Sequence, residues 1–503
     1  MTRIRGWSWA ALAGLAVPLA LTAVPAHAAT AAKPYDFDGD GHPDLVIGAP
    51  QLNRGSVTAT GGLVVVPGSD GAYPSGARII TQSTSKVVGA SEPYDYFGSA
   101  VASADFDADG FADLAVGSPG EDSKKDAGEG AVTILYGTSK GLGGARSSQI
   151  TEPSGKHRYA EFGGALVAGD LDGDGYPDLA VGAVDDLLDD SVTDDNPPSG
   201  TVTVLHGSRK GVKTSGSTLL RGNRAAENWD HRFGSALTVA DVDADGRLDL
   251  VVVSEGTNSE GAAHRGSLSY CPGTTAGPRS CRRLLHDGDL QSAGPVVVGN
   301  VQGDVRPEIV VGVPSTDDDT DPGSLEVVRL QGTGPATTGS ATRFDQRDAG
   351  LPGTGDSIDH FGAALAIGNV DGDGYADLVV GAPTEDVGDE RGAGRVFVVH
   401  GGAIGLATRG NTAYDQDTPG VPGGSEGSDG FGASVTLVDR DGDGRADLTV
   451  GAPGEDDDGG RVTTLLASGS GFTTVESRAY GLSTIDNSYD NRADASFGEV
   501  LGR

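Results

Sequence analysis

The residues of this 503-residue chain that could do chemistry recur as short acidic loops with carboxylates at alternate positions. The first loop reads DFDGDGHPD from Asp36 to Asp44, with acids at loop positions 1, 3, 5 and 9. Gly41 at position 6 permits a turn that folds these oxygens toward one point, where the backbone carbonyl of position 7 can join them. Hard oxygen ligands in this number suit Ca²⁺ better than Mg²⁺, which needs a tighter octahedron and retains water.

Six loops carry this pattern, and successive copies start about 60 to 70 residues apart. The predicted calcium ligands, with position 7 donating its carbonyl, are Asp36, Asp38, Asp40, His42 and Asp44; Asp105, Asp107, Asp109, Phe111 and Asp113; Asp170, Asp172, Asp174, Tyr176 and Asp178; Asp241, Asp243, Asp245, Arg247 and Asp249; Asn369, Asp371, Asp373, Tyr375 and Asp377; and Asp439, Asp441, Asp443, Arg445 and Asp447. Asn369 keeps an oxygen but loses a charge, so we expect its site to be weaker.

A seventh copy, NVQGDVRPE, is degenerate. It lacks acids at positions 1 and 3, where Asn300 and Gln302 stand, and it has Val305 in place of the glycine. We therefore expect this loop to bind no calcium. An EF-hand is excluded for the other loops because position 12, which should be Glu, is Ile47 in the first copy and Val116 in the second.

A second motif, Phe-Gly, precedes most of these loops by eight residues. In the second copy it opens the predicted strand Phe97–Ala104, and further strands are predicted at Leu114–Gly117, Ala131–Tyr136 and near Ser148–Thr151. The other Phe-Gly pairs start at Phe162, Phe233, Phe361 and Phe431. Four short strands per repeat, seven repeats and no convincing amphipathic helix predict an all-β, seven-bladed β-propeller of four-stranded antiparallel blades.

The chain ends on the same phrase, SFGEVLGR from Ser496 to Arg503, without a loop after it. The first acidic loop has no Phe-Gly before it, so Phe497–Gly502 should supply the innermost strand of blade 1. Pairing with Leu45–Gly48 would then close the ring and remove its open edges.

The paired motifs, Phe-Gly and then DxDGDGxxDLxxGAP, resemble the FG-GAP repeats of the integrin α N-terminal propeller, in particular those of secreted bacterial relatives. The resemblance covers residues 29–503 and implies a propeller with calcium in the loops between strands 1 and 2. Integrins usually carry fewer calcium-bearing blades than the six expected here.

Composition indicates the compartment of the protein. Residues 1–28 have two early arginines, an Ala/Leu-rich run and Ala26-His27-Ala28, so they resemble a cleaved signal peptide of a secreted, extracellular protein. No later stretch is long and apolar enough to span a membrane.

The net charge of −36 disfavours nucleic acid and anionic membranes as partners. Cys271 and Cys281, the two cysteines, more often form a disulfide than remain free in such a protein.

The face opposite the calcium loops is the candidate ligand face, since its connecting loops are the longest and most varied. Aromatic and histidine side chains gather there before the Phe-Gly strands: Tyr94, Tyr96, His157, Tyr159, Trp229, His231 and His360. The alternative is that several of them simply pack over the blade tops.

Three functions fit these observations. The leading one is a non-catalytic binding or adhesion module for an extracellular protein or glycan, stabilised by calcium. A lectin-like propeller is an alternative, although the aromatic residues are unevenly spaced. The third is a relative of glycosylphosphatidylinositol-phospholipase-D-type hydrolases, in which the resemblance implies a separate zinc-binding catalytic domain. The nine histidines are scattered, and no triad or nucleophile elbow is present, so we expect no enzymatic activity.

Overall fold

The structure is a computed structural model. It describes residues 32–68, 76–122, 127–142, 146–153, 159–186, 199–223, 230–256, 266–286, 290, 293–314, 322–331, 338–347, 350–353, 355, 358–469, 471–485 and 495–502. The predicted signal peptide, residues 1–28, lies outside the described residues.

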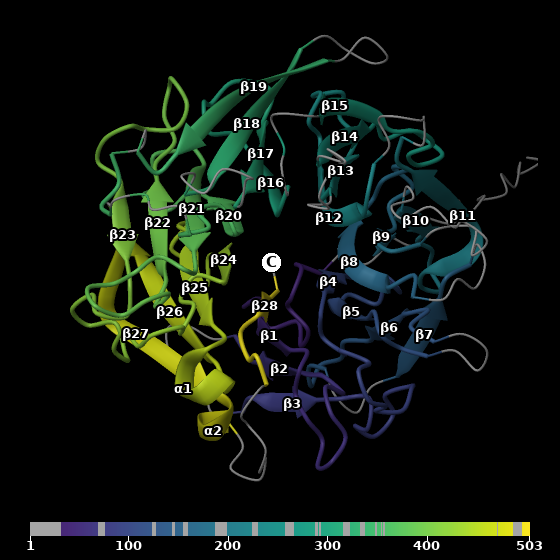
Figure 1. The fold of residues 1–503 in the computed structure, drawn as a ribbon. Helices are drawn as coiled ribbons and strands as arrows, with labels where there is room; N and C mark the ends of the chain where they lie inside the picture. The colour runs from purple at the N-terminus through teal and green to yellow at the C-terminus, as the bar shows by residue number, and fades with distance from the viewer. Residues whose placement is uncertain are drawn as a thin grey trace, which may run out of the picture.

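Seven four-stranded antiparallel sheets stand around a central axis as the blades of a propeller (Figure 1). Each sheet runs outward from the axis in chain order, and only blade 1 takes its innermost strand from the other end of the chain. The predicted fold class is therefore confirmed.

The innermost strands of blades 1 to 7 are β28 (Val500–Leu501), β4 (Val101–Ala104), β8 (Phe162–Gly169), β12 (Phe233–Ala240), β16 (Val296–Gly299), β20 (Ala364–Gly368) and β24 (Ser434–Val438). The second strands are β1 (Leu45–Ala49), β5 (Asp113–Ser118), β9 (Asp178–Ala183), β13 (Asp249–Ser254), β17 (Glu308–Val313), β21 (Asp377–Ala382) and β25 (Asp447–Ala452).

The third strands are β2 (Gly62–Val66), β6 (Ala131–Leu135), β10 (Thr201–His206), β14 (Ser267–Cys271), β18 (Ser324–Gln331), β22 (Arg395–Val399) and β26 (Arg461–Ser468). The outermost strands are β3 (Arg78–Ile80), β7 (Ser147–Thr151), β11 (Lys213–Arg221), β15 (Arg282–His286), β19 (Thr338–Asp345), β23 (Thr412–Tyr414) and β27 (Gly471–Gly481).

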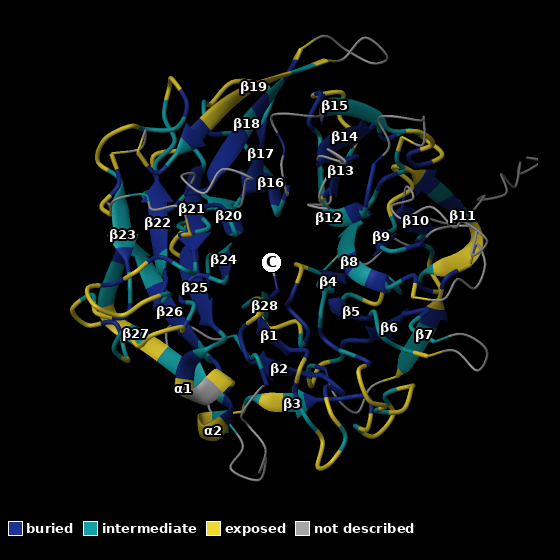
Figure 2. Cartoon of the chain, in the orientation of Figure 1, coloured by how far each residue is buried: buried dark blue, intermediate teal, exposed yellow. Residues whose placement is uncertain are grey.

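Burial follows strand position within each blade. Every residue of the second strand is buried in all seven blades, which explains the near-continuous apolar runs after the acidic loops. The outermost strands are more exposed, as β11 and β19 show (Figure 2). The described apolar core divides into seven clusters, and each one combines side chains of two neighbouring blades. The stability of the ring therefore depends on the seams between blades.

The two sequence motifs meet at these seams. The glycine of the second strand faces the Phe-Gly glycine of the next blade, so closely that an added Cβ at Gly117 would lie 2.1 Å from the Gly163 carbonyl oxygen. The same contact joins Gly381 to Gly432. The seam between blades 4 and 5 differs, because Val253 replaces the glycine and packs in one apolar cluster with Ala293. Where both glycines are lost together, side chains fill the seam.

The end of the chain closes the ring as predicted. β28 pairs antiparallel with β1 through Ile47 with Leu501 and Gly48 with Val500. The backbone N–H groups of Gly498 and Gly502 extend this pairing by donating to the carbonyl oxygens of β1. On its other side, Gly498 meets Gly451 of blade 7 as the other Phe-Gly glycines meet their neighbours.

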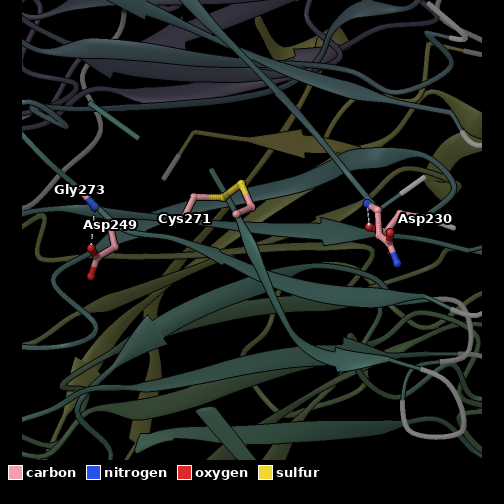
Figure 3. Close-up of a disulfide and its surroundings, with 6 residues drawn as sticks. Asp230, Asp249, Cys271 and Gly273 are labelled. Atoms are coloured by element: carbon pink, nitrogen blue, oxygen red, sulfur yellow. Dashed lines mark hydrogen bonds between the residues drawn. A yellow bond between two sulfur atoms is a disulfide. The ribbon is translucent and has the colours of Figure 1, made fainter. Parts of the chain in front are cut away.

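Two features modify the strand plan. The described residues include two helices of a single turn, α1 (Glu455–Asp458) and α2 (Leu482–Ile485), which the sequence did not indicate. In blade 4 the predicted disulfide between Cys271 and Cys281 is present, and it joins the two sides of the hairpin after β14 (Figure 3).

Candidate metal centres and the opposite face

The acidic loops join the first strand of a blade to the second, and their first carboxylate fixes the turn. In blade 1 the Gly41 N–H donates to Asp36 Oδ2 at 3.0 Å, and the Gly110 N–H donates to Asp105 Oδ2 at 3.0 Å in blade 2. The position-6 glycine adopts a positive φ, 97° for Gly41, which other residues rarely tolerate. In blade 2 the other oxygen, Asp105 Oδ1, accepts the Asp109 N–H, whereas Asp36 Oδ1 in blade 1 accepts no hydrogen bond from the described residues.

The carboxylate at position 9 connects two loops on the same face. In blade 1 the Phe37 N–H donates to Asp44 Oδ2 at 3.2 Å, while the Gly68 N–H of the loop between strands 3 and 4 donates to Asp44 Oδ1 at 2.8 Å. Asp113 makes the equivalent bonds to Phe106 and Gly137. Figure 3 shows the corresponding bond from Gly273 to Asp249 in blade 4. Position 9 is therefore structural as well as a candidate ligand.

These acids lie in an electrostatically unfavourable setting. Burial raises the pKa of Asp44 to about 7 and that of Asp113 to about 8, and repulsion from neighbouring loop carboxylates adds to the increase. Ligand oxygens of Asp36, Asp38 and Asp40 lie within 4.8 Å of one another. A divalent cation among them would stabilise the ionised carboxylates.

The donor set fits an oxygen-seeking cation. Asp36 Oδ1 and Asp107 Oδ1 are buried and have no hydrogen-bond partner among the described residues. A buried, unpaired carboxylate oxygen is costly, so a ligand at that point is physically reasonable. In blade 6, Asn369 offers a single oxygen, which accepts the Gly372 N–H at 2.8 Å. The weaker site expected there stays a prediction.

In blade 5 a positively charged arginine side chain lies at the corresponding loop. The Arg329 guanidinium from β18 pairs with Asp304 at position 5, and its Nε lies 3.2 Å from Glu308 Oε1 at position 9. Glu308 is 1% exposed, and its longer side chain replaces the aspartate of the other blades. A fixed positive charge thus neutralises the one loop that lacks the calcium pattern.

Position 7 has a role that the sequence reading missed. Its side chain covers position 4 of the loop in the preceding blade: an added Cβ at Gly39 would lie 2.9 Å from Phe111 Cε1, and one at Gly303 would lie 2.6 Å from Tyr375 Cε1. Arg247 reaches the loop of blade 3 in the same way, with Nη1 3.4 Å from a Cβ placed on Gly173. These large residues shield the neighbouring loop besides offering a carbonyl.

The opposite face presents some of the predicted aromatic residues but not all. Tyr94 is 56% exposed and Tyr159 is 59% exposed, and both stand three residues before a Phe-Gly pair, so they occupy equivalent places in blades 2 and 3. Tyr96 is half-buried beside Tyr94, with ring centroids 6.2 Å apart. His231 is 2% exposed, so a ligand cannot reach it without movement of the loop. Trp229 and His157 lie outside the described residues.

Buried polar clusters at the blade junctions of this face are a second feature that sequence reasoning missed. Gln82, at the end of blade 1, donates its Nε2 to Glu121 of blade 2, and Asp95 of the intervening loop is 1% exposed beside them. Gln416 and Glu455 form the same pair between blades 6 and 7. The signal was present in the sequence as a Gln just after the fourth strand and a Glu two residues after the GAP or GSP triplet.

No described helix is long and apolar enough to cross a membrane. The FG-GAP repeat family matches residues 29–66, 97–135, 162–205, 361–399 and 431–465. The unmatched blades, 4 and 5, flank the seam that lacks paired glycines. With seven blades closed in a ring, the chain is a β-propeller in which five blades match the FG-GAP repeat.

Curated proteins of two kinds are similar to this chain in sequence. Phosphatidylinositol-glycan-specific phospholipase D of Homo sapiens is 29% identical over 405 residues, which make up 73% of this chain and 45% of the relative. Integrin alpha-V of Gallus gallus is 32% identical over 231 residues, or 44% of this chain and 20% of the relative. Integrin alpha pat-2 of Caenorhabditis elegans is 30% identical over 231 residues, or 43% and 17%. The chain therefore spans less than half the length of these relatives.

Proposed function

We propose that this protein is a secreted, calcium-stabilised propeller that acts as a non-catalytic binding or adhesion module for an extracellular protein or glycan. The observation that carries the calcium part is the convergence of carboxylate oxygens in the acidic loops of blades 1, 2 and 3. The exception in blade 5 supports it, because Arg329 supplies a positive charge in the loop whose acids are lost.

Calcium would act here by joining the two turns on one face of each blade. At about 1 mM free calcium and a dissociation constant on the order of 10⁻⁴ M, one site adds about 1.4 kcal/mol to the free energy of unfolding. Six sites would add about 8 kcal/mol, which is comparable to the net stability of a whole domain. The ion would be a structural element, with ligand recognition left to the opposite face.

The binding role rests on the similarity to integrin α chains and on the exposed side chains opposite the calcium loops. Tyr94 and Tyr159 are exposed at equivalent places, and Ile358, 62% exposed, occupies that place in blade 6. Amphipathic aromatic side chains of this kind are enriched where proteins bind ligands. The matching tyrosines of blades 2 and 3 favour, as a second candidate, a glycan-binding version of the same role.

A glycan and extracellular-matrix array, probed with calcium and with a chelator, tests the proposal. We expect binding that is lost in the double variant Tyr94→Ala/Tyr159→Ala and kept in the matched surface variant Ile404→Ala. Ile404 is 93% exposed and lies after β22, on the face of the acidic loops. Failure to bind any array component, together with turnover of a phosphatidylinositol glycan, would replace the binding role with a hydrolase.

Secretion has its own test. Expression of the full chain in a secreting host should place the protein in the medium with Ala29 as its new N-terminus. Retention inside the cell with Met1 intact would contradict this part of the proposal.

A further inference from the structure

Two histidines outside the acidic loops point at them. His206 ends β10, and the pairing of Leu205 with Leu179 places it opposite Asp178, at loop position 9 of blade 3. His400 follows β22, and the pairing of Val399 with Leu378 places it opposite Asp377 in blade 6. Both histidines therefore occupy one place in the blade, next to a candidate metal loop.

The distances repeat between the two blades. His206 Nδ1 lies 3.5 Å from Asp172 Oδ2 and 3.5 Å from Asp178 Oδ1. In blade 6, His400 Nδ1 lies 3.6 Å from Asp371 Oδ2 and 3.1 Å from Asp377 Oδ1. In each case the imidazole nitrogen faces the same two loop positions, 3 and 9.

Three of these separations match those of ligands around a small tetrahedral cation, whereas the 3.1 Å contact of His400 Nδ1 with Asp377 Oδ1 is a hydrogen bond that a cation would replace. Ligands about 2.0 to 2.2 Å from Zn²⁺ lie about 3.3 to 3.6 Å from one another. In each set, the three ligand atoms lie within 4.8 Å of one another. His206 Nδ1 is buried and has no hydrogen-bond partner among the described residues, although it is directed at two carboxylates.

The surroundings hold the ligands in place. Asp178 Oδ1 accepts the Gly207 N–H at 2.8 Å, and Asp377 Oδ1 accepts the Gly401 N–H at 3.0 Å, so each carboxylate is oriented by backbone. The His206 ring packs against Gly277 of the next blade, where an added Cβ would lie 2.9 Å from Cε1.

At the same strand position, blade 5 carries a positively charged arginine side chain. There the pairing of Ile309 with Val328 places Arg329 opposite Glu308, and its guanidinium contacts loop positions 5 and 9. The remaining blades carry residues at this position that offer no imidazole nitrogen: Pro67, Tyr136, Pro272 and Leu466. Only blades 3 and 6 thus combine the acidic loop with an imidazole at this place.

An imidazole changes the cation preference of a carboxylate site. Ca²⁺ takes oxygen ligands, whereas imidazole nitrogen favours Zn²⁺ and its neighbours in the first transition series. We propose that blades 3 and 6 can bind, in competition with calcium at the same loops, a divalent transition-metal cation of the Zn²⁺ class, through Asp172, Asp178 and His206 in blade 3 and through the equivalent residues of blade 6. This inference rests on the proposed function in one respect, that the acidic loops are cation sites.

Metal titration of the full chain tests the inference. Protein freed of metal by chelation is titrated with Zn²⁺ by calorimetry in the absence of calcium, and Co²⁺ serves as a probe with visible absorption. We expect two tight zinc equivalents in the parent, one in His206→Asn and one in His400→Asn, and none in the double variant. Each lost site should weaken at least about 10-fold, because even changes outside the ligand shell reach that size.

The control is His360→Asn. His360 lies on the other face, where its Nδ1 contacts Thr384 Oγ1 at 2.9 Å. This variant should bind zinc like the parent, and circular dichroism shows whether each variant keeps the β-sheet fold. Equal zinc binding in the parent and the double variant would overturn the inference.

Calcium titration of the same samples separates the two proposals. If calcium binds and zinc binding ignores the histidines, the inference fails and the calcium proposal stands. If zinc binding follows the histidines but calcium does not bind, the inference stands and the calcium proposal fails.

Discussion

Replacing Gly451 with alanine should weaken the seam that closes the ring. The added Cβ would lie 2.0 Å from the Gly498 carbonyl oxygen and 2.4 Å from Ser434 Oγ. Real Cβ contacts essentially never fall below 3.0 Å. Because the nearest atom belongs to the backbone, the two blades must separate locally by about 1 Å.

The expected magnitude follows from this contact. Overpacking of a tight site typically costs about 1 to 3 kcal/mol. The displacement also strains the hydrogen bond from the Gly432 N–H to the Gly451 carbonyl oxygen, which is 3.0 Å long and contributes about 0.5 to 1.5 kcal/mol. The free energy of unfolding should therefore fall by about 2 to 4 kcal/mol.

Urea unfolding at saturating calcium measures this change against two controls. Gly381→Ala makes the same contact at an internal seam, with the Gly432 carbonyl oxygen at 2.0 Å, and should lose as much stability as Gly451→Ala. Gly469→Ala meets nothing within 4 Å and should change stability by less than about 0.5 kcal/mol. Suppose that Gly451→Ala lost no more unfolding free energy than Gly469→Ala while Gly381→Ala lost about 2 to 4 kcal/mol. That result would show that the closing seam does not support the ring.

Two further predictions concern charged groups. Arg329→Ala should destabilise the protein by about 1 to 2 kcal/mol, because the buried Glu308 carboxylate loses its partner, the Arg329 guanidinium. The control Arg347→Ala, which removes an exposed ion pair, should change stability by less than about 0.5 kcal/mol. Equal urea midpoints for the two variants would contradict this prediction. Burial, reinforced by repulsion from Glu121, raises the pKa of Asp95 to about 7. The folded chain thus holds this proton more tightly than the unfolded chain, so its contribution to stability is present below about pH 4 and is lost as pH rises toward 7. Asp95→Asn should flatten the decline of unfolding free energy between pH 5 and 8 at constant calcium, and an unchanged slope would refute the assignment.

The blade count and the closure of the ring could be predicted because both depend on strict spacing. The distance from Phe-Gly to the acidic loop fixes the phase of each repeat, and Phe497 keeps that phase. Even there, strand limits differed: the predicted strand from Phe97 begins only at Val101, since Gly98 has a φ of 99°. An added Cβ at Gly98 would lie 2.6 Å from the Gly62 carbonyl oxygen of blade 1. The motif is therefore partly a contact between blades.

Contacts between blades and across strands account for what the sequence could not predict. Phe111 covers Gly39 of another repeat, and Gln82 meets Glu121 across a junction, so neither pair follows from local spacing. His206 and His400 show no metal-binding spacing in the sequence, because strand register brings them to their loops. His231 was read as a loop residue of the ligand face, yet it is buried.

The central claim, that calcium stabilises the ring, is tested most directly by thermal melting with 1 mM calcium and with a chelator. Loss of about 8 kcal/mol of unfolding free energy should lower the melting temperature by about 8 °C, because the unfolding entropy of a chain of this length is roughly 1 kcal/mol per degree. Calcium should restore the midpoint, and magnesium should not, because its octahedral preference does not match these loops. A melting temperature that is the same with and without the chelator would contradict the account.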